Sequence, residues 1–224
     1  MSKIYLISEF IFLFLLIPLI IYRYRLKLKY YYVFILLVVF LICLVLLLTE
    51  NKFNLSALYF FGFSTGVMER ILVRFFAGGI ILSVLQYQIN RKAFFHFPKK
   101  HFWMWILVIL TYPVISVYPQ EIIYRLFIFH RYGVFFENPV TFILISSIAF
   151  AYLHIIFGNY IAPVLTLFGG LMFASTFYDS GSIIMSSIEH ALWGDLLLTI
   201  GLGRYFYSGA IKKLEFIKGP EDDV

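Results

Sequence analysis

The sequence predicts an all-α fold, a polytopic membrane helical bundle of about seven or eight transmembrane helices. Hydrophobic residues make up 62% of the 224 residues and charged residues only 13%. Soluble domains contain about half and about a quarter of these two classes. No soluble core can cover so much apolar surface, so lipid must serve as part of the solvent. The apolar residues also fall into long runs separated by basic loops, a pattern typical of multi-pass membrane proteins.

Seven apolar runs are candidate spans, since a crossing helix needs about 20 apolar residues. They cover residues 4–22, 30–49, 70–89, 103–118, 140–157, 160–178 and 182–202. An eighth segment, 119–136, is apolar but includes Glu121, Arg125, His130 and Arg131. We therefore expect it as a helix buried inside the bundle, crossing fully or in part. The chain then divides into three parts. Spans without a motif cover residues 1–102, a core with the ionisable residues covers 103–202, and a tail covers 203–224.

The basic residues predict the orientation of the chain. The first run is too long for the apolar part of a signal peptide and is followed by no small-residue cleavage site, so we interpret it as an uncleaved span. Arg23, Arg25, Lys27 and Lys29 follow it, and a second cluster contains Arg91, Lys92, Lys99 and Lys100. By the positive-inside rule both loops are cytoplasmic. The net charge of +6 thus indicates loop orientation and contact with anionic headgroups rather than nucleic-acid binding.

Ionisable residues inside the apolar runs are the candidate site, because each costs about 2.5–3.5 kcal/mol at a helix centre in lipid. The first group follows Pro119, which suits the first turn of a helix. Glu121 would then lie near a helix N-terminus, where the helix dipole favours an anion. Arg125 lies four residues on and therefore on the same face. The pair is either part of a site or a buried structural ion pair.

Two histidines in later runs form the second group. His154 lies near the end of the 140–157 run, and Asn159 follows on the next loop, where it could orient the imidazole. Glu189 and His190 are adjacent in the middle of the last run, and packing alone does not explain two such groups there.

The residues after His190 are the third group. Asp195 is five residues further on, about 140° around an ideal helix, so a local bulge is needed to bring the two to one face. Gly194 does share the face of His190, and its missing side chain could let a substrate backbone approach. The pair Gly169-Gly170 we interpret as a helix-packing surface.

Alternating the spans from the basic loops places Glu121, His154 and His190 at similar depth, with Asp195 nearby. A carboxylate and two imidazoles at one depth can activate a water as general base and stabilise an oxyanion. They could instead hold zinc through Glu121, His154 and His190 with one open position. The residues alone do not choose between these alternatives.

These motifs resemble a known family. The segment Gln120–Arg125 has the form xExxxR, Phe150–His154 has the form Phe-x-x-x-His, and His190 lies in a final apolar helix. Together they resemble the CPBP family, the CAAX prenyl endopeptidases and bacteriocin-processing or immunity proteins, over about residues 103–202. The resemblance implies an intramembrane endopeptidase with a site between helices, a water activated by Glu and His, an oxyanion held by the last His with a polar partner, and no metal. It also implies a bacterial or archaeal cell membrane.

The sequence departs from the family at two positions. Gln120 stands where the leading glutamate, the expected base, usually lies, and Gly194 stands where Asn or Asp often follows the last histidine. Both acids are displaced by one residue in the same direction. We therefore expect Glu121 as base, Asp195 as the shifted polar partner, Arg125 as orienting cation, His154 as second water-activating group, and His190 on the oxyanion.

The leading interpretation is an endopeptidase acting on a membrane-associated peptide or protein. An alternative is a non-catalytic member, a membrane scaffold or bacteriocin-immunity protein, which Gln120 favours. Another is a proton-coupled transporter using Glu121, His154 and Glu189 as a relay. The sequence has no inverted repeat and no pair of broken helices in matching halves, which disfavours the transporter.

Overall fold

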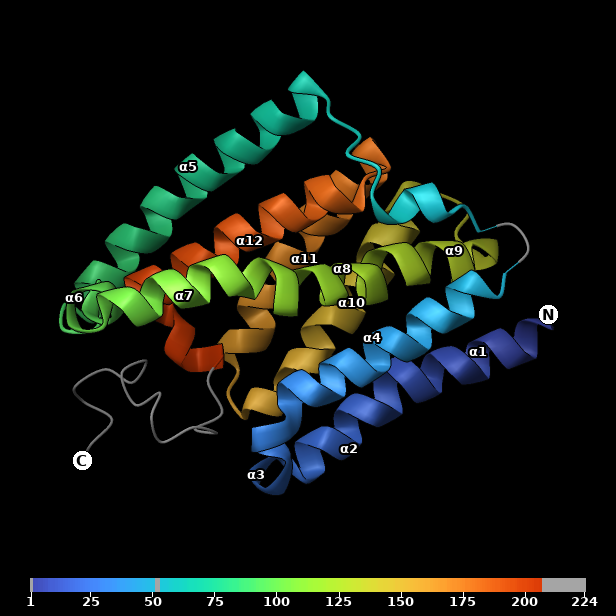
Figure 1. Cartoon of the computed structure of the whole chain (residues 1–224), viewed down its shortest axis with the longest axis horizontal. Helices are drawn as coiled ribbons and strands as arrows, with labels where there is room; N and C mark the ends of the chain where they lie inside the picture. The colour runs from blue at the N-terminus through green and yellow to red at the C-terminus, as the bar shows by residue number, and fades with distance from the viewer. Residues whose placement is uncertain (1, 51–52, 207–224) are drawn as a thin grey trace.

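The computed structural model describes residues 2–50 and 53–206, and within them the chain is helical with no β-strand (Figure 1). The predicted all-α membrane bundle is confirmed. Most of the predicted tail, residues 207–224 with Lys212, Lys213 and the final acids, lies outside the described residues.

Six helical segments of the described chain are long and apolar enough to cross a membrane. They are Lys3–Arg23, Arg25–Leu48, Phe102–Phe135, Pro139–Phe157, Ile161–Ser180 and Ile183–Ile200. The number is smaller than predicted for two reasons. The runs 103–118 and 119–136 form one continuous helical segment, in which Glu121, Arg125 and Arg131 have partners inside the bundle. The run 70–89 is a helix, α5 (Thr65–Ile89), that is not among the six and carries Glu69, Arg70 and Arg74 in its first turns.

The first two spans form an antiparallel hairpin. α1 (Lys3–Ile11), a π-helical turn (Phe12–Leu16) and α2 (Ile17–Arg23) lead to the short α3 (Arg25–Leu28), and α4 (Tyr32–Leu48) returns. Figure 1 shows α6 (His96–Lys100) at the left edge and α3 at the bottom, both away from the N-terminus and α9 at the right. The two basic clusters thus lie toward the same side of the bundle, as the positive-inside rule predicted.

The long central segment changes helical pitch on either side of Glu121. It consists of α7 (Phe102–Tyr112), a π-helical turn (Pro113–Val117), α8 (Tyr118–Glu121), a second π-helical turn (Ile122–Phe127) and α9 (Ile128–Tyr132). Pro113 and Pro119 lack the backbone N–H that a regular helix uses, so wider turns are favoured near them. Such π-helical turns are often found at functional sites.

Three helices complete the bundle: α10 (Pro139–Leu153), α11 (Ile161–Ser180) and α12 (Ile183–Ile200). Asn138 caps α10 by accepting a hydrogen bond from Thr141 N at 3.0 Å. α10 and α11 pack closely at Gly170, where a Cβ would lie 3.1 Å from Ser147 Cα. The predicted packing role of this glycine is confirmed.

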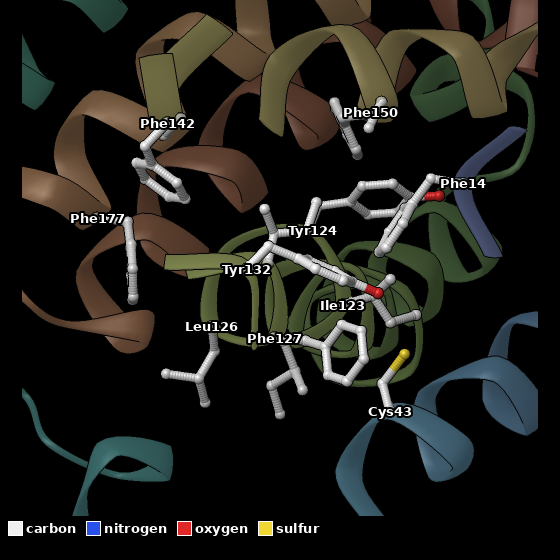
Figure 2. Close-up of a cluster of buried hydrophobic side chains, with 14 of the residues drawn as sticks. Phe14, Cys43, Ile123, Tyr124, Leu126, Phe127, Tyr132, Phe142, Phe150 and Phe177 are labelled. Carbon is white, nitrogen blue, oxygen red and sulfur yellow. The ribbon is translucent and has the colours of Figure 1, made fainter. Parts of the chain in front are cut away.

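An aromatic core surrounds the central segment (Figure 2). Phe14 of the first span packs edge-on against Tyr124 and Tyr132, with ring centroids 5.6 and 6.1 Å apart. Cys43 of α4 is buried in the same cluster. At the end of the central segment, Arg131 forms a bidentate ion pair with Glu9 of α1 and contacts Glu50, just after α4, which ties α9 to the N-terminal hairpin.

Candidate active site

The Glu121 carboxylate, at the end of α8, is fully buried and is held by three side chains. His190 Nδ1 lies 2.8 Å from Oε1, and Ser186 Oγ donates a hydrogen bond to Oε2. These two partners lie one turn apart on α12. Arg125 Nε lies 3.3 Å from Oε2, as the four-residue spacing predicted. Protein groups therefore occupy both carboxylate oxygens.

Arg125 is also fully buried, and three kinds of contact stabilise its charge. Besides the ion pair, Nη1 donates a hydrogen bond to Ser146 Oγ at 2.6 Å, and Ser146 in turn donates to Tyr124 O at 2.7 Å. The guanidinium carbon lies 5.0 Å from the centroid of the Phe150 ring, within cation–π range. Both Ser146 and Phe150 belong to α10, so this arginine joins the central segment to α10.

His190 is fixed in orientation by its neighbours. Since an ionised carboxylate only accepts hydrogen bonds, Nδ1 carries a proton and donates it to Glu121. The imidazole is stacked on Phe173, with centroids 4.5 Å apart and planes at 14°, and meets Phe150 edge-on at 5.4 Å. Nε2, on the other side of the ring, lies 3.5 Å from the Tyr112 hydroxyl.

His154 lies at the end of α10, in the 3₁₀ turn His154–Phe157. Its Nδ1 is 2.8 Å from Phe150 O, and a carbonyl only accepts, so Nδ1 carries the proton and Nε2 the lone pair. The Phe150 ring lies 4.7 Å from the His154 ring and 5.4 Å from the His190 ring. The structure thus places Glu121 and His190 in direct contact, whereas His154 approaches His190 across one phenylalanine.

Gln120 and His154 line the same cavity, of about 320 Å³. Gln120 Nε2 donates a hydrogen bond to Ser116 Oγ at 2.7 Å, and this serine also lines the cavity. The side chain therefore turns away from Glu121, as the ~100° step between adjacent helix residues predicted. The other walls are largely apolar and come partly from the N-terminal hairpin, including Ile17, Leu36 and Val39. The first spans carry no motif but shape this cavity.

Glu189 and Asn159, two further candidate site residues, have partners away from the Glu121–His190 pair and His154. Glu189 is fully buried, accepts a hydrogen bond from Thr176 at 2.6 Å and pairs with Arg74 of α5 at 3.4 Å. Asn159 accepts from Ala162 N at 2.9 Å, at the start of α11, and donates to Tyr205 O at 2.7 Å. Its side chain is thus engaged away from His154, contrary to the expectation that it orients this histidine.

Asp195 lies five residues after His190 on a regular α-helix, without the bulge that would bring both to one face. Its Oδ1 is buried and has no hydrogen-bond partner among the described residues. Gly194 does face the His190 side, as predicted, but the space beside it is filled. A Cβ there would collide with the Tyr112 ring. Sequence reasoning missed Tyr112, which lies in a run that was read only as a span.

The residues as placed do not fit the zinc site that the sequence left open. Across residues 2–50 and 53–206, no group of three or more His, Cys, Asp or Glu side chains is arranged to hold a metal ion. The Glu121 carboxylate already faces a guanidinium, an imidazole N–H and a hydroxyl, and the positive charge of Arg125 disfavours a second cation beside it.

The fold and the site define an integral membrane protein with a buried acid–imidazole pair and a second histidine beside a cavity between helices. Residues 99–194 match the family model described as type II CAAX prenyl endopeptidase Rce1-like. This match confirms the predicted CPBP resemblance over the segment that contains Gln120, Glu121, His154 and His190. Searches of curated proteins and of solved structures gave no match.

Proposed function

We propose that this protein is an intramembrane endopeptidase that hydrolyses a membrane-associated peptide at the cavity lined by Gln120 and His154. One observation carries the proposal. His190, held by Glu121 at 2.8 Å, and His154 both contact the ring of Phe150, and His154 also lines the cavity. The match of residues 99–194 to the family model supports the same class of activity.

The geometry favours a different role for Glu121 from the one expected of a base. A base must reach water, whereas this carboxylate is fully buried, is not part of the cavity lining, and already accepts hydrogen bonds from Ser186 and His190. We assign Glu121 to orienting His190 through Nδ1, in the manner of the buried acid in a catalytic triad. Arg125 compensates the charge of Glu121 within the bundle.

His154 is the base in this proposal. With its proton on Nδ1, the Nε2 lone pair can accept a proton from water. Gln120 donates its amide hydrogen to Ser116, which leaves Oε1 to accept a hydrogen bond from the same water. An amide cannot take a proton at this step, so Gln120 positions the water and His154 removes its proton.

The reaction needs no metal in this scheme. The water oxygen attacks the peptide carbonyl carbon while its proton moves to His154 Nε2. The carbonyl π electrons move to oxygen, and the resulting oxyanion accepts a hydrogen bond from the protonated form of His190. When the C–N bond breaks, His154 returns its proton to the leaving nitrogen, which gives a new carboxyl end and an amine.

The cavity suits a peptide with an apolar anchor. Its walls are mostly apolar, and the polar side chains are fewer and include Lys29, Ser116, Gln120 and His154. We propose that the substrate lies in or on the bilayer, and that the bilayer is a bacterial or archaeal cell membrane.

Gln120 also supports a second candidate, a non-hydrolysing family member that binds a membrane peptide as a scaffold or immunity protein. The cavity holds an amide where the family has its leading carboxylate, and the nearest acid is sealed off from it. In that case His154 would serve only in binding.

The experiment compares membrane fractions of cells that express the protein or its variants and counts new peptide N-termini by mass spectrometry. Hydrolysis predicts termini that require the wild-type chain and disappear in His154→Ala. The matched control is His130→Ala, because His130 is exposed on α9, contacts the rings of Phe53 and Phe129, and does not line the cavity. New termini in Gln120→Glu but none in the wild type would instead establish the non-hydrolysing candidate, whose missing carboxylate has then been restored.

A further inference from the structure

Tyr112 fills the space beside Gly194 of α12, where the glycine has no side chain. It is the last residue of α7 and directly precedes Pro113 and the first π-helical turn. Its ring lies against Gly194, where a Cβ would collide with it. Any side chain at position 194 would therefore displace this tyrosine.

The hydroxyl of Tyr112 faces Nε2 of His190, the ring nitrogen that does not contact Glu121. The oxygen lies 3.5 Å from Nε2, and the two rings meet edge-on with centroids 6.4 Å apart. This separation is longer than a strong hydrogen bond, which is closer to about 2.8 Å. A third oxygen can lie about 2.8 Å from both atoms and accept from each of them, because two such contacts span 3.5 Å in a bent arrangement.

We propose that the Tyr112 hydroxyl is the second donor to the reaction oxyanion, together with His190 Nε2. It takes the place of the polar residue that the sequence lacks four positions after His190, and Gly194 is the residue that admits it. A donor aimed at the developing charge in a water-poor site is worth much more than the same donor in water. This inference rests on the proposed hydrolytic function and adds a residue to it.

Asp195 is thereby not required as the polar partner of His190. It lies one residue beyond the position that shares the His190 face, whereas Tyr112 reaches Nε2 from a neighbouring helix segment. Glu121 and Asp195, the two acids displaced by one residue from the family pattern, therefore differ in their relation to His190. Glu121 contacts His190, and a tyrosine stands where the second polar group is needed.

The test is Tyr112→Phe, which keeps the ring against Gly194 and removes only the hydroxyl. We expect kcat to fall about 10²-fold with little change in KM, because the donor acts on the oxyanion and not on the bound peptide. Tyr118→Phe is the matched control, since its hydroxyl donates to Leu58 O at 2.7 Å, away from His190, and its kcat should stay unchanged. Gly194→Ala, which displaces the tyrosine without removing it, should reproduce the loss.

A binding measurement separates this role from a structural one. A phosphonate peptide, which imitates the tetrahedral oxyanion, should bind Tyr112→Phe about 10²-fold more weakly than the wild type, while the uncleaved parent peptide binds both equally. If the wild type cleaves and Tyr112→Phe cleaves equally fast with equal phosphonate affinity, the inference is overturned and the proposed function stands. If the wild type itself cleaves nothing, both are overturned.

Discussion

Glu121 Oε1 and His190 Nδ1, which lie 2.8 Å apart, join the central segment to the last span at a point fully enclosed by protein. The same carboxylate faces Arg125, so acid, imidazole and guanidinium form one buried unit. Its members come from residues 69 positions apart in the sequence. This unit positions His190, and the cavity beside His154 lies next to it.

Removal of the acid should destabilise the protein strongly. Glu121→Leu leaves Arg125 as an uncompensated buried charge, which costs about 3–5 kcal/mol. We expect a lower midpoint of thermal unfolding in detergent, and partial recovery in the double variant Glu121→Leu/Arg125→Met, where no lone charge remains.

The control for this prediction is the exposed pair of Arg70 and Asp179, whose side chains are 48% and 43% exposed. Asp179→Asn should change the free energy of unfolding by only about 0–1 kcal/mol. Equal destabilisation by Glu121→Leu and Asp179→Asn would show that burial of the Glu121 unit is not what matters.

Arg131 should hold the N-terminal hairpin to the bundle. It pairs with Glu9 through two nitrogens at 2.9 Å each and with Glu50 at 2.8 Å. Arg131→Ala leaves both acids without this partner, so we expect a loss of about 3 kcal/mol and faster proteolysis of the hairpin. Arg131→Lys should recover little, because an ammonium cannot reproduce the bidentate contact. Full stability in the lysine variant would contradict this account.

A chelator should leave cleavage unchanged. The oxygens of Glu121 are directed at Arg125, Ser186 and His190, and the charge of Arg125 disfavours a metal cation at this residue. The measurement is the cleavage rate before and after exhaustive dialysis against EDTA, with metal content determined by mass spectrometry. A rate that falls on dialysis and returns with added zinc would count against the proposed mechanism.

Much of this architecture could be predicted from the sequence. Bulk apolarity and run length predicted the spans, and the helical period predicted both the Glu121–Arg125 pair and the separate direction of Gln120. These are local or compositional properties, which a single chain carries in its own spacing.

The remainder depends on contacts between distant segments. The π-helical turns on both sides of Glu121 change the helical phase, which an ideal period cannot anticipate. Ser186 and Tyr112 contribute to the site only because helices from distant parts of the sequence meet there, and each looks like ordinary span sequence. The cavity likewise needs the N-terminal hairpin, whose residues show no motif.

The role of His154 is tested most directly by chemical rescue. The purified protein in proteoliposomes is given a peptide identified from the membrane-fraction experiment, and His154→Ala is assayed with and without added imidazole. We predict a loss of about 10²–10⁴-fold and a partial return with imidazole, which can enter the cavity of about 320 Å³ and act as the missing base. A wild-type cleavage rate in His154→Ala would contradict the assignment of His154 as base. The assignment would also be contradicted if formate restored cleavage to Glu121→Ala while imidazole restored none to His154→Ala.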